Sequence, residues 1–227
     1  MNDQVIHGIP SKRPLVEGDI ISIDMGVRMN GFYGDSAVTV AVGRISDEAA
    51  RLLRVTQESL EKGIEQVRLG GRVSDIGHAI QQHVEGAGFS VVREFVGHGI
   101  GASLHEEPQI ANYGDPGRGP RLAEGMTLAI EPMVNAGKPA VKVLGDGWTA
   151  VTKDKALSAH FEHTVVVTED GCRILTLPEG EGEREAPAGA SPDASTRSGS
   201  SRPPDKLEVA PSTAEGRVKS ADEQAHV

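Results

Sequence analysis

The sequence contains an internal repeat, which predicts that the chain folds as two related halves. Three segments recur in the same order: residues 7–9 match 98–100, residues 16–27 match 123–134, and residues 34–40 match 161–167. Each match aligns a histidine with a histidine or an acid with an acid: His7 with His98, Asp24 with Glu131, and Asp35 with Glu162. Because the order and the polar residue types both recur, we expect a pseudo-twofold relation between the halves.

The periodicity of apolar residues changes along the chain. Residues 19–27 and 36–42 are β-branched and apolar like buried strands, and Asn30-Gly31 predicts a hairpin turn between them. Residues 46–69, which open with a serine N-cap, and residues 74–87 have helical spacing instead. Strand-like segments follow at 90–96, 126–134, 139–143 and 161–168. This order predicts an α+β fold.

The two halves differ in what precedes their His-Gly-Ile triplets. Both predicted helices precede the second triplet, whereas six residues precede His7. If related halves carry related helices, we expect that a helical segment before Met1 is missing. The sheet face formed by residues 5–42 should then be apolar and exposed.

The composition changes near residue 178. Residues 178–227 contain no Phe, Trp or Tyr and consist mainly of Ser, Ala, Glu, Gly and Pro with scattered charge. Such a segment buries too little apolar surface to offset the entropy of ordering it. We therefore expect one folded domain over residues 1–177 and a disordered tail over residues 178–227.

Charge and cysteine content bear on partners and compartment. A formal net charge of −10 favours bound cations over nucleic acid. The single cysteine, Cys172, is typical of a reducing compartment. The sequence has neither the apolar core of a signal peptide nor a run of about 18 apolar residues. We expect a cytoplasmic monomer that binds neither nucleic acid nor membrane.

Five side chains are candidate metal ligands: Asp24, Asp35, His98, Glu131 and Glu162. Taken singly, each acid is better explained by a Lys or Arg partner at a strand end. Taken together, four carboxylates in apolar segments with few basic neighbours need positive charge, because burying an unpaired charge is costly. Four carboxylates and one imidazole suit two ions of Mn, Fe(II) or Co, with Zn as a further candidate. Two such ions activate water for amide hydrolysis.

Other polar features leave alternatives open. His105, in LHEEP, is a candidate for contact with the ligands or with a substrate, whereas His7 fits substrate contact and a solvated loop equally well. Trp148 lies in a turn-like segment and is either incidental packing or the wall of an apolar pocket. Residues 97–101 (GHGIG) match neither the Rossmann nor the P-loop pattern, so we expect their glycines to let the backbone approach the metal site.

The remaining histidines are expected to lie outside the site. His163 should point to the face opposite Glu162, because successive strand residues alternate. Structural roles are expected for His78, His83 and His160.

Eight motifs carry a resemblance to a known family. They are HGIP, IDMGV, GFYGD, GHGIG, LHEEP, IEPMVN, DGWTAVTKD and FEHTVVVTEDG, within residues 4–177. Together they resemble the type I methionine aminopeptidases of the pita-bread fold. The separation of 31 residues between Glu131 and Glu162 leaves no room for the helical insertion of type II enzymes.

The resemblance implies removal of the initiator methionine from nascent chains, near the ribosome, with a preference for a small second residue. It also implies two ion sites that share Asp35 and Glu162, with Asp24 completing one site and His98 and Glu131 the other. Glu131 would also serve as general base.

The resemblance extends to the substrate site. His7 and His105 match the family's substrate-contacting histidines, which makes them catalytic candidates beside Glu131, and Trp148 matches its pocket tryptophan. Two features depart from the family. By comparison with the family, we expect a segment before HGIP that contributes to the methionine pocket to be missing. Leu104 stands where many bacterial members have Phe.

Two alternatives stand beside an active aminopeptidase. One is a fragment that binds metal without turning over substrate. The other is a non-enzymatic binding protein on the same fold, which would be expected to have lost ligands.

Overall fold

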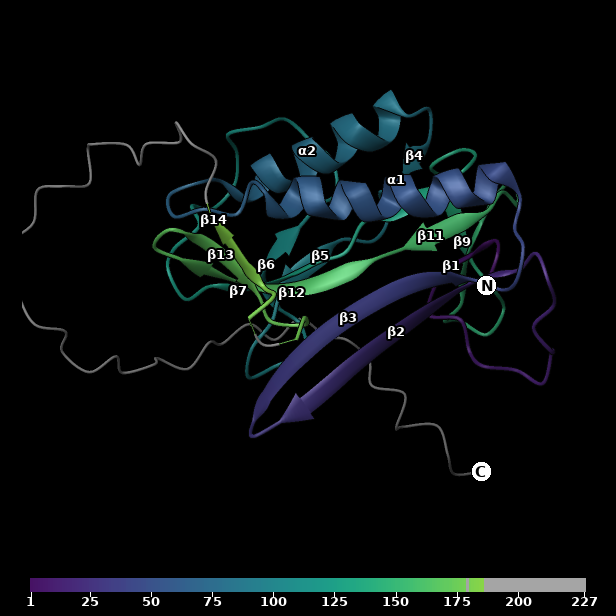
Figure 1. Cartoon of the computed structure of the whole chain (residues 1–227), viewed down its shortest axis with the longest axis horizontal. Coiled ribbons are helices and arrows are strands. Elements are labelled where there is room, and N and C mark those ends of the chain that lie inside the picture. Colours follow the sequence, from purple (N-terminus) through teal and green to yellow (C-terminus); the bar gives the residue numbers. More distant parts are fainter. Residues whose placement is uncertain (179, 186–227) are drawn as a thin grey trace, which may run out of the picture. The chain divides into compact units, whose positions relative to one another are not determined.

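The computed structural model describes residues 1–178 and 180–185. They belong to a compact unit, Met1–Pro192, in which two helices combine with strands numbered β1 to β14 (Figure 1). The expected α+β class is confirmed.

The main sheet has eight strands, all joined by antiparallel pairing. They are β2 (Ile20–Met29), β3 (Phe32–Ala41), β5 (Gly97–Gly99), β6 (Glu106–Ile110), β7 (Thr127–Ile130), β12 (Glu162–Thr168), β13 (Gly171–Ile174) and β14 (Glu183–Glu185). Strand β12 pairs with β7 along one edge. Along its other edge, the start of β12 pairs with β3 and the rest pairs with β13. The sheet thus joins the first half of the chain to the second through the β3–β12 pair.

Two smaller sheets flank it. One has the order β1 (Gln4–Ile6), β10 (Ala150–Thr152), β9 (Val141–Val143), and the other β11 (Ser158–His160), β8 (Met133–Asn135), β4 (Ser90–Val91). The strand predicted over residues 126–134 is therefore divided between two sheets. Pro132 lies at the division, where a residue without an N–H interrupts strand pairing.

Strands β2 and β3 form the predicted hairpin. Asn30 and Gly31 have φ values of 52° and 91°, as a two-residue turn that matches the strand twist requires. The strands pair in continuous register from Ile20↔Ala41 to Met29↔Phe32. Turn chemistry and β-branched content thus suffice to predict this element.

The two helices begin close to their predicted positions. Helix α1 (Asp47–Ile64) starts after Ser46, whose Oγ accepts a hydrogen bond from the Ala49 N–H at 3.1 Å. Helix α2 (Val73–Gly86) follows. α1 ends earlier than predicted, because Gln66 and Val67 turn back onto Gly63 and Ile64 with bonds from residue i to i−3.

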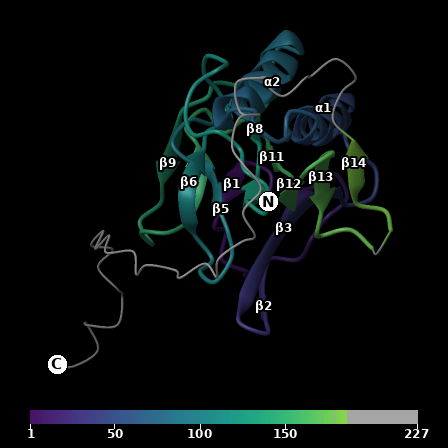
Figure 2. The ribbon, with the colours of Figure 1, turned by 90° about the vertical axis from the view of Figure 1, so that its left-hand side faces the viewer.

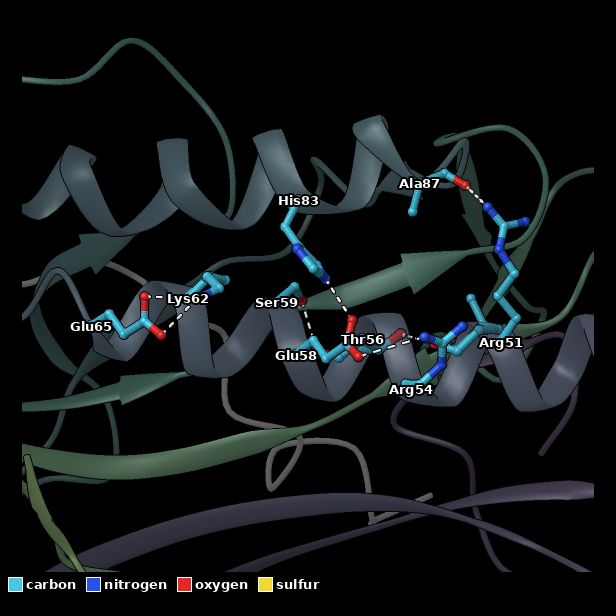
Figure 3. A network of polar contacts seen from close by, with 10 residues as sticks. Arg51, Arg54, Thr56, Glu58, Ser59, Lys62, Glu65, His83 and Ala87 are labelled. Carbon is cyan, nitrogen blue, oxygen red and sulfur yellow. Dashed lines mark hydrogen bonds and ion pairs between the residues drawn. The ribbon is translucent and has the colours of Figure 1, made fainter.

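Polar contacts connect the helices (Figure 3). His83 Nε2 on α2 lies 3.0 Å from Glu58 Oε2 on α1, and Arg54 lies 3.7 Å from the other oxygen of Glu58. Arg51 donates to the Ala87 carbonyl at the end of α2. His83 thus has the structural role expected of it.

Both helices pack on one face of the main sheet. The core beneath them includes side chains that are at most 1% exposed, Leu128, Ile130, Val165 and Val167. His163 on β12 pairs with Ile130 on β7 and with Ser36 on β3, and paired residues point to the same side of a sheet. The side of the sheet that carries the helices is therefore continuous with one face of the β2–β3 hairpin, called here its outer face.

The helices do not cover the outer face of the hairpin, because the hairpin projects away from them in both views (Figures 1 and 2). Exposure reaches 60% at Val27 and 72% at Met29. The other exposed apolar side chains of the hairpin are Ile23, Met25, Phe32, Val38 and Val40. The apolar, exposed face expected from the repeat is therefore present.

The boundary predicted at residue 177 is too early. Glu183–Glu185 pairs with β13 as β14, and the Ile174 N–H donates to the Gly182 carbonyl. An edge strand of this kind is held by its backbone, so a polar composition does not prevent it. The rest of the predicted tail, residues 179 and 186–227, lies outside the described residues.

Neither α1 nor α2 combines the length and the hydropathy needed to cross a bilayer.

Candidate metal centre

Strand register brings the first-half ligand candidates to one face of the main sheet. Directly paired residues point to the same side, as do residues two apart on one strand. Ala37 on β3 pairs with Asp24 on β2 and with Glu162 on β12. Asp35 lies two residues before Ala37. Asp24, Asp35 and Glu162 therefore face the same side.

The second-half candidates share that side. Ala129 on β7 pairs with Thr164 on β12 and with His98 on β5. Glu131 lies two residues after Ala129, and Glu162 lies two residues before Thr164. All five candidates thus face away from the helices. A register in which Asp24 and Glu131 faced opposite sides would have excluded a shared site.

The side chains converge to different degrees. One oxygen each of Asp35 and Glu162 and a ring nitrogen of His98 lie within 4.8 Å of one another. Glu131 Oε1 is 3.5 Å from His98 Nε2. Asp24 is exposed and lies outside the three-residue group, although its charge acts on both Asp35 and Glu162. Four candidates therefore form a tight cluster, and Asp24 lies at its margin.

The electrostatics of the cluster favour a bound cation. Burial, together with the charges of Glu131, Asp35 and Asp24, raises the pKa of Glu162 to about 10. Burial and the charge of Asp24 also raise the pKa of Asp35, against a lowering effect of His98. These shifts follow the upward direction expected for crowded carboxylates. Glu162 Oε1 is buried without a hydrogen-bond partner among the described residues.

Local hydrogen bonds fix the orientation of the ligands. The Asp35 N–H donates to Thr164 Oγ1 at 2.9 Å, and the Thr164 hydroxyl donates to the Asp35 carbonyl at 2.8 Å. His98 Nδ1 lies 2.9 Å from the Gly99 carbonyl. Because Nδ1 then carries the proton, Nε2 keeps its lone pair on the side of the acids, as metal-binding histidines require.

The glycines around His98 let neighbouring strands approach closely. A Cβ on Gly97 would clash with the Ala129 carbonyl on β7, and a Cβ on Gly99 with the Glu107 carbonyl on β6. These glycines let β5 fit between two neighbouring strands. They act on the site only by placing His98.

A cavity of about 960 Å³ lies beside the cluster, with Asp24, His160, His7 and Trp148 among its lining residues. The His7 and Trp148 rings stack at a centroid distance of 4.8 Å and an interplanar angle of 24°. His7 has a φ of 58°, a conformation that is sparsely populated outside glycine and that clusters at functional sites. The His7 residue is exposed, and its contact with a substrate stays a prediction.

His105 and Leu104 lie on the β5–β6 side. The His105 ring meets the His98 ring edge-on, with centroids 4.4 Å apart. Leu104 packs over the backbone of Gly26 in β2.

Residues 1–169 match the sequence profile of metallopeptidase family M24. The chain belongs to this family.

Several known proteins are similar to this chain in sequence and in fold. The M24 chain is 58% identical over 176 residues to methionine aminopeptidase 1 of Bacillus subtilis, covering 78% of this chain and 71% of that protein. The methionine aminopeptidase structure from Rickettsia prowazekii matches with a TM-score of 0.77 at 48% identity, covering 78% and 71%. That from Thermotoga maritima matches with 0.76 at 53% identity, covering 77% and 71%. The expected pita-bread fold is thereby confirmed.

Membership of family M24 implies divalent metal ions, and the residues present fit them. Asp35, His98 and Glu162 offer one nitrogen and several oxygens from three different strands. The buried, unpartnered oxygen of Glu162 and the raised pKa values are features that a cation would resolve.

One residue of this M24 chain lies in the site although the sequence did not predict it there. His160, for which a structural role was expected, lies with Nε2 3.6 Å from Glu131 Oε2. It lies two residues before Glu162, a spacing that places side chains on one side of an extended segment. His163 instead bonds to Thr176 and His78 to the Gly114 carbonyl, consistent with the positions expected for them.

Proposed function

We propose that the chain removes N-terminal methionine from proteins whose second residue is small. The observation that carries the proposal is the convergence of Asp35, His98, Glu131 and Glu162 beside a cavity lined by His7 and Trp148. Relatives at 50–58% identity are named methionine aminopeptidases, which supports the same activity.

Two ions suit the ligand set. Asp24, Asp35 and Glu162 would hold one, and Asp35, His98, Glu131 and Glu162 the other. Ions of Mn, Co, Fe(II) or Zn, when bound, would supply Lewis acidity at the peptide carbonyl and lower the pKa of a water.

The chain's own residues divide the remaining work. Glu131 takes the proton from the attacking water, as its place beside His98 permits. His105 faces the scissile peptide from its position against the His98 ring. The stacked pair of His7 and Trp148 holds the N-terminal residue in the cavity.

The substrate sets the partner and the compartment. Nascent chains carry an initiator methionine as they leave the ribosome, so we place the activity in the cytoplasm near the ribosome, with a monomer as the working form. The non-enzymatic alternative is not favoured, because all five ligand candidates are present and share one face. The inactive alternative is not favoured, because relatives that are similar in sequence are named as enzymes.

The first prediction concerns substrate choice. With Mn²⁺ or Co²⁺ present, the chain should release methionine from Met-Ala-Ser much faster than from Met-Lys-Ser, because a bulky second residue obstructs the site. Methionine release, followed by chromatography, measures both rates. A chelator should stop the reaction, and added metal should restore it.

Three outcomes count against this function. They are rapid cleavage of Met-Lys-Ser, cleavage that survives thorough chelation, and metal binding by calorimetry without release of methionine from either peptide. The last would favour the metal-binding, inactive alternative.

A further inference from the structure

His160 is a buried histidine held firmly at the end of β11. Its residue exposure is 1%. The His160 N–H donates to Thr39 Oγ1 and its carbonyl accepts from the Thr39 hydroxyl, both at 2.8 Å. Thr39 also meets Ser22 Oγ at 2.8 Å. The hairpin β2–β3 thus fixes the backbone from which the His160 ring projects.

The ring of His160 faces the carboxylate of Glu131. Nε2 lies 3.6 Å from Glu131 Oε2 and has no hydrogen-bond partner among the described residues. The other oxygen, Oε1, lies 3.5 Å from His98 Nε2. Glu131 is therefore flanked by two imidazoles, one on each oxygen.

The two imidazoles are not equivalent. Since His98 Nδ1 is satisfied by the Gly99 carbonyl, its Nε2 offers a lone pair to a cation. The buried Nε2 of His160 needs a partner, because an unsatisfied buried polar group is destabilising. A small movement of Glu131 would shorten the 3.6 Å between His160 Nε2 and Glu131 Oε2 to the length of an ordinary N–H···O hydrogen bond.

We propose that His160 is a positioning residue for Glu131. Its Nε2–H donates to Oε2 and thereby directs Oε1 toward the His98 side of the site. Hydrogen bonds of this kind orient metal-binding carboxylates, and their loss typically costs 10–100-fold in metal affinity or activity. The inference rests on the proposed function insofar as Glu131 is taken as the base.

The test compares His160→Leu with His160→Gln. Leucine fills a similar volume without a donor, whereas the glutamine amide restores an N–H near the position of Nε2. His163→Leu is the matched control, because His163 bonds to Thr176 instead. Each variant is assayed for kcat and KM on Met-Ala-Ser at saturating Mn²⁺, for Mn²⁺ affinity by calorimetry, and for unfolding in urea.

His160→Leu should lower kcat by about 10–100-fold, with KM within about twofold and with weaker Mn²⁺ binding. His160→Gln should recover most of both losses, and His163→Leu should change neither.

Several results would overturn the proposal. One is unchanged kcat and Mn²⁺ affinity in His160→Leu. A second is a change confined to KM, which would place His160 on the substrate. A third is a glutamine variant as impaired as the leucine variant, which would indicate a packing role. If the unaltered chain releases no methionine, the proposed function fails, but the Mn²⁺ affinities of the three variants still decide the role of His160.

Discussion

Glu131→Gln is expected to reduce methionine release by about 10²–10⁴-fold, the usual contribution of a general base, while at least one metal ion stays bound. The amide keeps one oxygen for a cation and the same shape between His98 and His160. It cannot accept a proton from the attacking water. Measurement of kcat on Met-Ala-Ser, together with metal content after dialysis, checks both parts.

Two variants sharpen the Glu131 experiment. His105→Ala should keep its metal and lose turnover, because His105 is expected to face the scissile peptide. Glu124→Gln removes an exposed acid shortly before β7 and should leave the rate unchanged. A Glu131→Gln variant that cleaves as fast as the unaltered chain would remove Glu131 from the role of base.

The second large effect concerns Glu162 in the metal-free chain. Its pKa of about 10 in the folded state lies above the ordinary 4.5. A raised folded pKa means that the folded state retains a proton that the unfolded state has released. The stabilisation is complete below pH 4.5 and is lost as the pH rises toward 10. Between pH 7 and 9, the free energy of unfolding of the metal-free chain should therefore fall as the pH rises.

Glu162→Gln should abolish that decline, because the amide has no proton to release. Urea unfolding in chelator at pH 7, 8 and 9 measures the difference between the two chains. The N-terminus, whose pKa burial lowers, and Cys172, whose pKa burial raises to about 11, cancel in that difference.

The same substitution should weaken Mn²⁺ binding by more than ~100-fold, beyond the 10–100-fold typical of outer partners. Parallel pH profiles for the two chains would show that the pKa of Glu162 is not raised in the folded state. Unaltered Mn²⁺ affinity would show that Glu162 is not a metal ligand.

Sequence reasoning succeeded where the signal is local. The Asn30-Gly31 turn and the Ser46 cap depend on a few neighbouring residues, so their chemistry predicts them directly. The repeat made the acids stand out as a set, because it aligned Asp24 with Glu131 and Asp35 with Glu162. The site roles drawn from that set are predictions that the experiments above test.

Sequence reasoning failed where a residue's surroundings come from distant segments. Gly97–Gly99 lies outside the strand predicted over residues 90–96, yet it is a strand because it pairs with both β6 and β7. The spacing of His160 from Glu162 placed both on one side of an extended segment, but its contact with Glu131 depends on the tertiary fold, which brings β11 to the end of β7. Glu183–Glu185 has a polar composition and is ordered by the edge of β13.

The hairpin β2–β3 carries an exposed apolar surface on one face and candidate metal ligands on the other. Asp24 and Asp35 project from one face, while Met25, Val27 and Met29 are exposed on the other. A metal ion that joins Asp35 to the second half would also hold this projecting arm against the body of the protein. By reciprocity of coupled equilibria, whatever covers the outer face of the arm would tighten metal binding at the inner face. Amide hydrogen exchange along β2 and β3, including amides distant from the ligand carboxylates, would then report on the occupancy of the site.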